Sequence, residues 1–368
     1  MNDRRILEHV QNDDGSRDLD WLKQAIQYAI ELEFFTIPPY LTAFWSIKDH
    51  RDPVAVAIRE VLVEEMLHMS LACNMLVSIG GIPKIDDPEV VPRYPNPMPG
   101  GVKPLLTVAL EGLSETAIRT FMAIEEPETD ISTLEAVRAD ETFTRIGEFY
   151  DAIENAFYGI DEIESLMTRE GQVEGYFGET QQPDGSDVPK SIGTLSEVSA
   201  AIKLIKDQGE GTSEDIGDPD TGELAHYYRF KEIDVGKKLV FIPGRDWVHA
   251  GPEVAMPDRW PVVKVPPGGY RIEDVDDENV WANMQQFDVA YTKVIRQLQL
   301  AWTPDAGLEG GQAALHKGLE LMMSDLPRLA RQIMQVSKDN QNQNYAPNFR
   351  YVPDEVTQDE VTEEGAIE

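Results

Sequence analysis

The chain has 368 residues, of which 41% are hydrophobic and 8% aromatic, so it is long enough to bury a sizeable core. It carries 67 acidic against 32 basic residues, a formal net charge of −35, and such a surface repels nucleic-acid phosphates and anionic lipid. Because the acids occur along most of the chain, we interpret them as solvated surface and expect neither nucleic acid nor a membrane as a partner.

Three further features indicate a reduced, cytoplasmic setting. No run of 18 apolar residues is present, so no transmembrane helix is expected. The amino-terminal 18 residues have an arginine pair, Arg4-Arg5, but no apolar stretch after it, which argues against a signal peptide. The only cysteine, Cys73, lies inside a helical pattern and excludes both a disulfide framework and a cysteine-based zinc site.

A long helix is predicted from Trp21, with Asp18 or Asp20 as its N-cap. Glu33 lies on the apolar face of this helix, whereas Glu31 lies nearly opposite. Pro38-Pro39 should bend or interrupt the helix one turn later, because proline lacks a backbone donor and clashes with the preceding turn.

The run from Pro53 to Gly80 predicts a second helix with a Glu-x-x-His motif on its apolar stripe. At about 100° per residue, Glu65 and His68 fall in the middle of this stripe, while Glu64 points the other way. Burying an ionised carboxylate there is costly unless it is paired or bound to a metal. The alternative to a metal is a lone core histidine that forms a salt bridge with its neighbour.

A proline-rich connection, residues 82–104, is expected to run extended across the outside of a bundle. The next helix is predicted between a Ser114 cap and a Pro127 stop, with Glu125 on its inward stripe and Glu126 off it. A further helical segment covers residues 140–158. Its Glu148 lies almost opposite the apolar face, so we treat it as a second-choice ligand.

After a surface loop at 171–193, a helix is predicted from about Thr194 and is broken by the glycines on either side of Glu210. The chain resumes as ELAHYYRFKEI, where Glu223 and His226 share one side and form a second Glu-x-x-His motif. Glu210 competes with Glu223, because an inserted loop can bring the acid before a helix break next to the histidine after it. We favour Glu210, since the flanking glycines let the backbone turn its side chain into the bundle.

The chain is thus divided into four parts, and an all-α fold is expected. Residues 18–235 form a helical bundle with long loop insertions, and residues 236–275 form an irregular cover or a short strand pair. Residues 276–340 form an accessory C-terminal pair of helices, which begin at Glu278 and Gly310. Residues 341–368 are polar and acidic and are interpreted as a partly disordered tail.

Four helical regions each offer an inward carboxylate, and two of them add a histidine three residues on. A dinuclear carboxylate site in a four-helix bundle uses this set. Carboxylate oxygens and imidazoles suit iron(II), our first choice, or manganese(II). The competing interpretation, that these acids pair with arginine or lysine, is disfavoured because the inward stripes carry almost no basic residues. The candidate ligands are Glu33, Glu65, His68, Glu125 and His226, completed by Glu210 or Glu223.

A family resemblance rests on the combined strings AIELEFFTIPPYLTAFWSI, EEMLHMSLACNMLVSIGGIP, FMAIEEPE, IGEFYDAI, IKDQGEG and HYYRF. Over residues 20–235 the chain resembles the ferritin-like family named after iminophenyl-pyruvate dimer synthase, which includes the ferritin-like region of violacein and rebeccamycin pathway proteins. The resemblance implies a ferritin-like bundle with a di-metal site at Glu33, Glu65, His68, Glu125, Glu210 and His226. It implies no particular substrate for this chain.

The function expected from these patterns is that of an oxidoreductase in which two metal ions activate dioxygen on a small organic substrate. The catalytic residues beyond the metal ligands are not assigned, and a homo-oligomer is left open. Iron storage or detoxification is one alternative, although the loops at 82–104, 171–193 and 211–221 would obstruct the packing of a closed shell. A metal-free structural scaffold is the other alternative.

Overall fold

Two long helices, α2 (Leu19–Ser46) and α3 (Pro53–Ser78), contact each other at the centre of the fold. The computed structural model describes residues 17–99, 102–103, 105–127, 146–174, 191–209, 216–218, 222–338 and 343–355. Asp18 caps α2 by accepting a hydrogen bond from the amide of Trp21, and Asp52 caps α3 in the same way. Helix α3 is long and apolar enough to cross a membrane, but 94% of its most apolar window is buried inside the protein.

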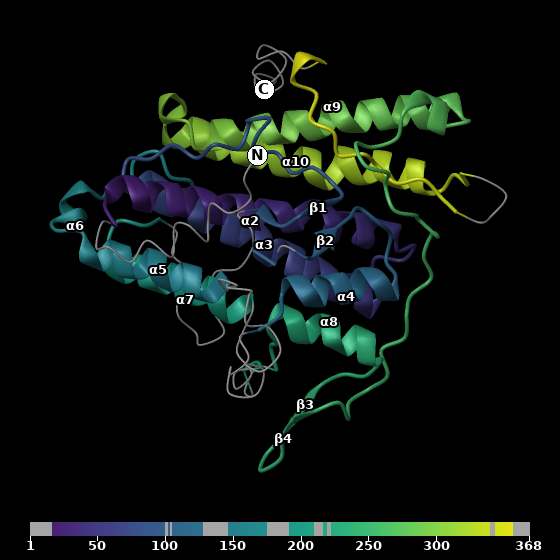
Figure 1. The fold of residues 1–368 in the computed structure, drawn as a ribbon, viewed down its shortest axis with the longest axis horizontal. Coiled ribbons are helices and arrows are strands. Elements are labelled where there is room, and N and C mark those ends of the chain that lie inside the picture. Colours follow the sequence, from purple (N-terminus) through teal and green to yellow (C-terminus); the bar gives the residue numbers. More distant parts are fainter. Residues whose placement is uncertain are drawn as a thin grey trace.

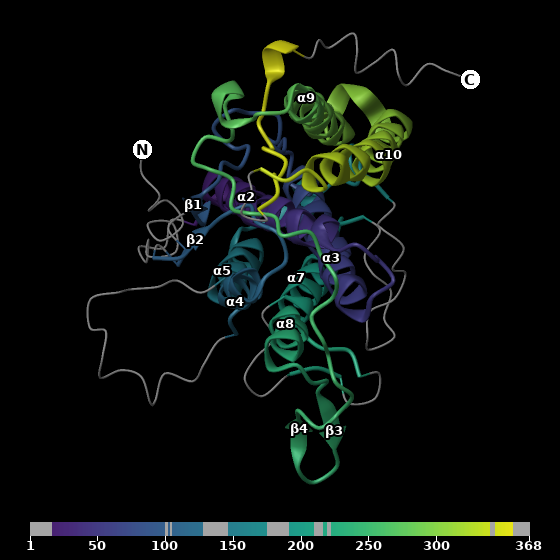
Figure 2. The ribbon, with the colours of Figure 1, turned by 90° about the vertical axis from the view of Figure 1, so that its right-hand side faces the viewer.

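The other two helices of the bundle are each split into two pieces. One consists of α4 (Glu115–Ile124) and α5 (Ile146–Gly159), and the other of α7 (Leu195–Gln208) and α8 (His226–Val235). Helix α4 contacts α8 and α5 contacts α7, and α4 continues the line of α5 as α8 continues that of α7 (Figures 1 and 2). A one-turn helix, α6 (Ile163–Leu166), follows α5. The predicted all-α four-helix bundle with insertions is confirmed.

The break between α7 and α8 is bridged by the backbone. The amide of His226 donates to the carbonyl of Gly209 over 3.2 Å, so the second piece starts where the first one stops. Gly217 and Leu224 form an antiparallel bridge across the base of the insertion. A Cβ atom on Gly217 would lie 2.1 Å from the carbonyl oxygen of Glu223, so this close approach requires glycine. Helix α8 therefore resumes at the end of α7.

Helix α2 runs without interruption through Pro38 and Pro39, so the predicted interruption is wrong. Pro39 cannot donate to the carbonyl of Phe35, which would leave that buried acceptor without its helical partner. The hydroxyl of Tyr94 donates to this carbonyl over 2.6 Å. The proline-rich connection that carries Tyr94 thus supplies the donor that the helix itself lacks.

The strands are short and lie outside the bundle. In the proline-rich connection, β1 (Asn96–Pro97) pairs antiparallel with β2 (Thr107–Val108). In the predicted cover, β3 (Val240–Ile242) pairs antiparallel with β4 (Asp246–Val248), and this hairpin projects from the body of the molecule (Figure 1). Short 3₁₀ turns occupy Ile272–Asp274, Pro304–Ala306 and Pro353–Glu355.

The accessory pair consists of α9 (Glu278–Ala301) and α10 (Gly307–Met334), which contact each other and lie against the α2–α3 face of the bundle (Figure 2). Residues 344–349 of the expected tail are buried. Phe349 is 3% exposed, stacks on Trp45 at 6.0 Å and meets the edges of Phe287 and Tyr291. The expectation of a disordered tail is therefore wrong for residues 344–349, because Tyr345 and Phe349 belong to the core; residues 356–368 lie outside the described part.

The hydrogen bond that repairs α2 can be tested by replacing Tyr94 with Phe. The change keeps the ring against Phe35 and leaves the carbonyl of Phe35 buried without a partner, so we expect the free energy of unfolding to fall by about 1–3 kcal/mol. Urea unfolding measures the difference. Tyr158→Phe is the control, because the Tyr158 hydroxyl bonds to Ser199 at an exposed position. Equal stability of wild type and Tyr94→Phe would show that the carbonyl needs no replacement donor.

Candidate metal centre

Five side chains that can bind a metal meet in the middle of the bundle, each 7% exposed or less. They form two groups that share one member, and in each group the ligand atoms lie within 4.8 Å of one another. The first group is Glu33, Glu65 and His68; the second is Glu65, Glu125 and His226.

The chain places these residues at the centre and at the two helix breaks. Glu65 and His68 lie one turn apart on α3, and so project on the same side. Glu125 is the C-cap of α4, and His226 is the first residue of α8. Both split helices therefore open at the level of the site, and each break presents one candidate ligand to it.

Each of the three carboxylates accepts a hydrogen bond on one of its oxygens, and each from a different protein hydroxyl. Each carboxylate is thereby fixed in orientation and keeps its second oxygen for another partner. The donors are Tyr150 to Glu33 Oε1 at 2.5 Å, Thr36 to Glu65 Oε2 at 2.5 Å, and Tyr40 to Glu125 Oε1.

Glu65 lies between the two histidines. Its Oε1 is 3.0 Å from Nδ1 of His226 and 3.8 Å from Nδ1 of His68. Glu33 Oε2 lies 3.7 Å from Nδ1 of His68, and Glu125 Oε2 lies 3.6 Å from Nδ1 of His226. A carboxylate in this position can bridge two ions, each of which would have one histidine and one further glutamate.

Both imidazoles are oriented in the same way. Nε2 of His68 lies 3.0 Å from Oε1 of Gln208, and Nε2 of His226 lies 2.7 Å from Oε2 of Glu64. These acceptors favour the tautomer with the proton on Nε2 and leave the Nδ1 lone pair directed into the site. A histidine that binds a metal through one ring nitrogen characteristically donates a hydrogen bond from the N–H of the other, to a carboxylate or a carbonyl oxygen.

Glu64 was expected to lie off the inward stripe, and it is outside both groups of candidate ligands, but its burial was not expected. It is 2% exposed, accepts a hydrogen bond from Arg229 over 2.8 Å and contacts His226. Burial raises the pKa of this carboxyl, but the Arg229 guanidinium and His226 outweigh that effect and hold the pKa below its usual value. The middle of α3 is buried on two sides, because α2 covers one side and α8 the other. A prediction from a single apolar stripe therefore misses the burial of Glu64. The sequence feature that could have indicated this burial is Arg229, a basic residue three positions after His226 that can pair with a buried acid.

The charge of the site favours a bound cation. Burial, followed by repulsion from Glu125, raises the pKa of Glu65 to about 7. The ion pairs of Glu33, Glu65 and Glu125 in the structure are with the two histidines, whereas Glu64 has Arg229. A divalent ion would compensate this buried negative charge.

One buried atom indicates where an ion would fit. Nδ1 of His226 makes no hydrogen bond within the described part of the chain, although Glu65 Oε1 is only 3.0 Å away. With the proton on Nε2, both of these atoms are acceptors. An ion placed among these atoms accepts both lone pairs, so the residues present fit a metal.

The remaining predicted residues are less central or lie outside the described residues. Glu223 precedes α8, which begins at His226, so the expected helical turn from Glu223 to His226 does not exist. Its carboxylate is one-third exposed and lies 3.4 Å from Arg229. Glu210 and the side chain of Glu148 fall outside the described residues. Glu126 is exposed, as its position off the stripe predicted.

Comparisons with known proteins agree with this architecture. A family model described as Ferritin-like matches residues 26–235, a range that includes all five clustered residues. Among solved structures, the chain is similar to a ferritin-like protein from Caulobacter vibrioides, with a TM-score of 0.58 and 20% sequence identity. That similarity covers 91% of this chain and 99% of the other, and it concerns the fold alone. A search of curated proteins finds no match.

The role of Glu64 can be tested with Glu64→Gln. Because Glu64 orients His226, we expect its neutral analogue to weaken binding of iron(II) or manganese(II) by roughly 10–100-fold. Competition titration against a chelator of known affinity measures the change. Glu60→Gln, at an exposed position one turn earlier on α3, is the matched control. Unchanged affinity in a folded Glu64→Gln protein would contradict the assignment.

Proposed function

Because the chain belongs to the ferritin-like family, we propose that it is an oxidoreductase with two metal ions, iron in the first place and manganese in the second. Its co-substrates would be dioxygen and a small organic molecule. The observation that carries this proposal is the position of Glu65, between two inward-facing histidine nitrogens that each have a further glutamate beside them.

In this proposal each of the two ions would have one glutamate and one histidine of its own. Glu33 and His68 would hold one, Glu125 and His226 would hold the other, and Glu65 would bridge them. Glu210 would add the fourth carboxylate, on the side of His226. Such ions, when bound, would supply the electrons that reduce dioxygen.

The protein's own groups would prepare the site for this chemistry. Tyr40, Thr36 and Tyr150 fix the carboxylates, while Gln208 and Glu64 keep the proton on the outer nitrogen of each imidazole. Deep burial excludes water, which strengthens each electrostatic interaction and prevents side reactions.

The substrate is proposed to approach at the two helix breaks. Glu125 and Gly209 are the C-caps of α4 and α7, so both helices end beside the proposed ligands. The narrower resemblance, to the family named after iminophenyl-pyruvate dimer synthase, is also retained as a proposal. It leaves the substrate and the reaction type open.

The proposed centre predicts about two ions per chain, as in other dinuclear carboxylate sites. Replacing His68 with Ala removes one imidazole ligand, so we expect the bound metal to fall by about half or more. Elemental analysis of protein from iron-supplemented expression measures this ratio. His50→Ala is the control, since His50 contacts Arg331 and Phe44 far from the clustered acids in the fold. Equal metal contents in wild type and both variants would reject the ligand assignment.

The same preparation separates the alternatives. Hundreds of ions in a large particle would favour iron storage, and an absence of metal would favour a structural scaffold. For an oxidoreductase, dioxygen uptake by the iron(II)-loaded protein should exceed that of a Glu65→Gln variant severalfold. Similar uptake rates would show that the proposed bridge has no part in the reaction.

The missing carboxylate is proposed to be Glu210. Its neighbour Gly209 accepts a hydrogen bond from the His226 amide, whereas Glu223 pairs with Arg229. We therefore expect Glu210→Gln to lower metal occupancy and Glu223→Gln to preserve it, as measured by elemental analysis of the two variants. The reverse result would restore Glu223 as the ligand.

A further inference from the structure

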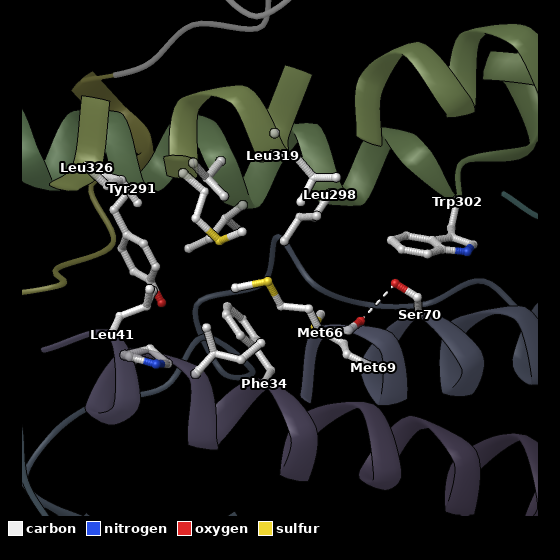
Figure 3. Close-up of a pocket in the computed structure, with 16 residues that line it drawn as sticks. Phe34, Leu41, Met66, Met69, Ser70, Tyr291, Leu298, Trp302, Leu319 and Leu326 are labelled. Carbon is white, nitrogen blue, oxygen red and sulfur yellow. Dashed lines mark hydrogen bonds between the residues drawn. The ribbon is translucent and has the colours of Figure 1, made fainter. Parts of the chain in front are cut away.

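A cavity of about 40 Å³ lies between the bundle and the accessory pair (Figure 3). Helices α2 and α3 form one wall, and α9 and α10 form the other. The side chains that line it are almost all apolar, and they include Phe34, Met66, Met69, Leu298 and Met322. Figure 3 shows Met66 and Leu298 directed into the space between the two helix pairs.

The lining of this cavity disfavours water. Its volume of about 40 Å³ is large enough for a water molecule, but a buried water needs about two to four polar partners. The Ser70 hydroxyl is already used, since it donates to the carbonyl of Met66. The Tyr291 hydroxyl, on a residue 4% exposed, has no hydrogen-bond partner among the described residues. Its oxygen is itself inaccessible to solvent, so an occupant meets an almost wholly apolar wall.

The cavity lies back to back with the candidate metal centre. Phe34 follows Glu33 along α2, and on α3 Met66 follows Glu65. Since successive helical residues project about 100° apart, the same helix pair presents the acids on one side and the cavity on the other. A molecule held here is separated from the metals by one layer of helices.

We propose that this cavity binds dioxygen. Only a very small uncharged molecule fits the volume, and apolar cavities of this kind bind gases such as xenon. The choice of dioxygen among such molecules rests on the proposed function, which consumes it. The flexible thioethers of Met66, Met69 and Met322 let the occupant enter without a change of fold.

The paramagnetism of dioxygen provides a direct test on the full chain. Protein labelled with ¹³C at the methionine methyl groups is prepared with zinc(II), which is diamagnetic, and methyl relaxation is compared under nitrogen and under oxygen. We expect the oxygen-induced relaxation of Met66, Met69 and Met322 to exceed that of three other buried methionines severalfold. These internal references are Met75, Met284 and Met334, which are fully buried and do not line the cavity.

A variant that fills the cavity, with a matched control, shows whether the excess relaxation comes from the cavity. Leu298→Phe should remove the excess relaxation by occupying the cavity, whereas Leu300→Phe, on the same helix but outside the lining, should retain it. In wild type, xenon under pressure should reduce the excess by competition, a result that needs no variant. Equal relaxation of the two methionine groups, or an excess that xenon and Leu298→Phe leave intact, overturns the inference. Because the test uses no redox metal, its failure leaves the metal count unaffected, and a failed metal count leaves this gas site standing.

Discussion

The structure depends on buried negative charge at the centre of an apolar helical bundle. Glu33, Glu65 and Glu125 are nearly inaccessible to water, and their ion pairs are with two histidines that also bond to other acceptors. Unpaired buried charge is among the most costly features that a fold can contain. The bundle reduces this cost with one hydroxyl donor for each carboxylate, and a divalent cation would remove most of what remains.

The two helix breaks serve the same centre. A continuous helix would present only side chains at the spacing of its own turns, whereas a helix that stops at Glu125 or restarts at His226 can place a terminal residue in the site. The register is kept by the hydrogen bond from His226 to Gly209 and by the close pairing at Gly217.

Local chemistry was sufficient to predict much of this arrangement. The caps at Asp18 and Ser114 and the 3.6-residue period of the apolar side chains located the main helices. The same period selected Glu33 and Glu65, which the structure brings together with the other clustered residues.

The failures have a common physical cause, namely contacts from distant parts of the chain. Pro39 is tolerated because Tyr94 replaces its missing donor, and Glu64 is buried because α8 covers it and brings Arg229. Phe349 enters the core because Trp45 and Phe287 provide a matching aromatic surface. None of these partners is close in sequence, so a reading of one segment at a time cannot find them.

The central claim is that Glu65 bridges two ions, and anomalous diffraction at the iron edge from crystals of the iron-loaded protein tests it most directly. The account predicts two peaks roughly 3.5–4 Å apart on either side of the Glu65 carboxylate. One should lie within bonding distance of Nδ1 of His68 and the other within bonding distance of Nδ1 of His226. A single peak, or ions bound through the Nε2 atoms, would contradict it.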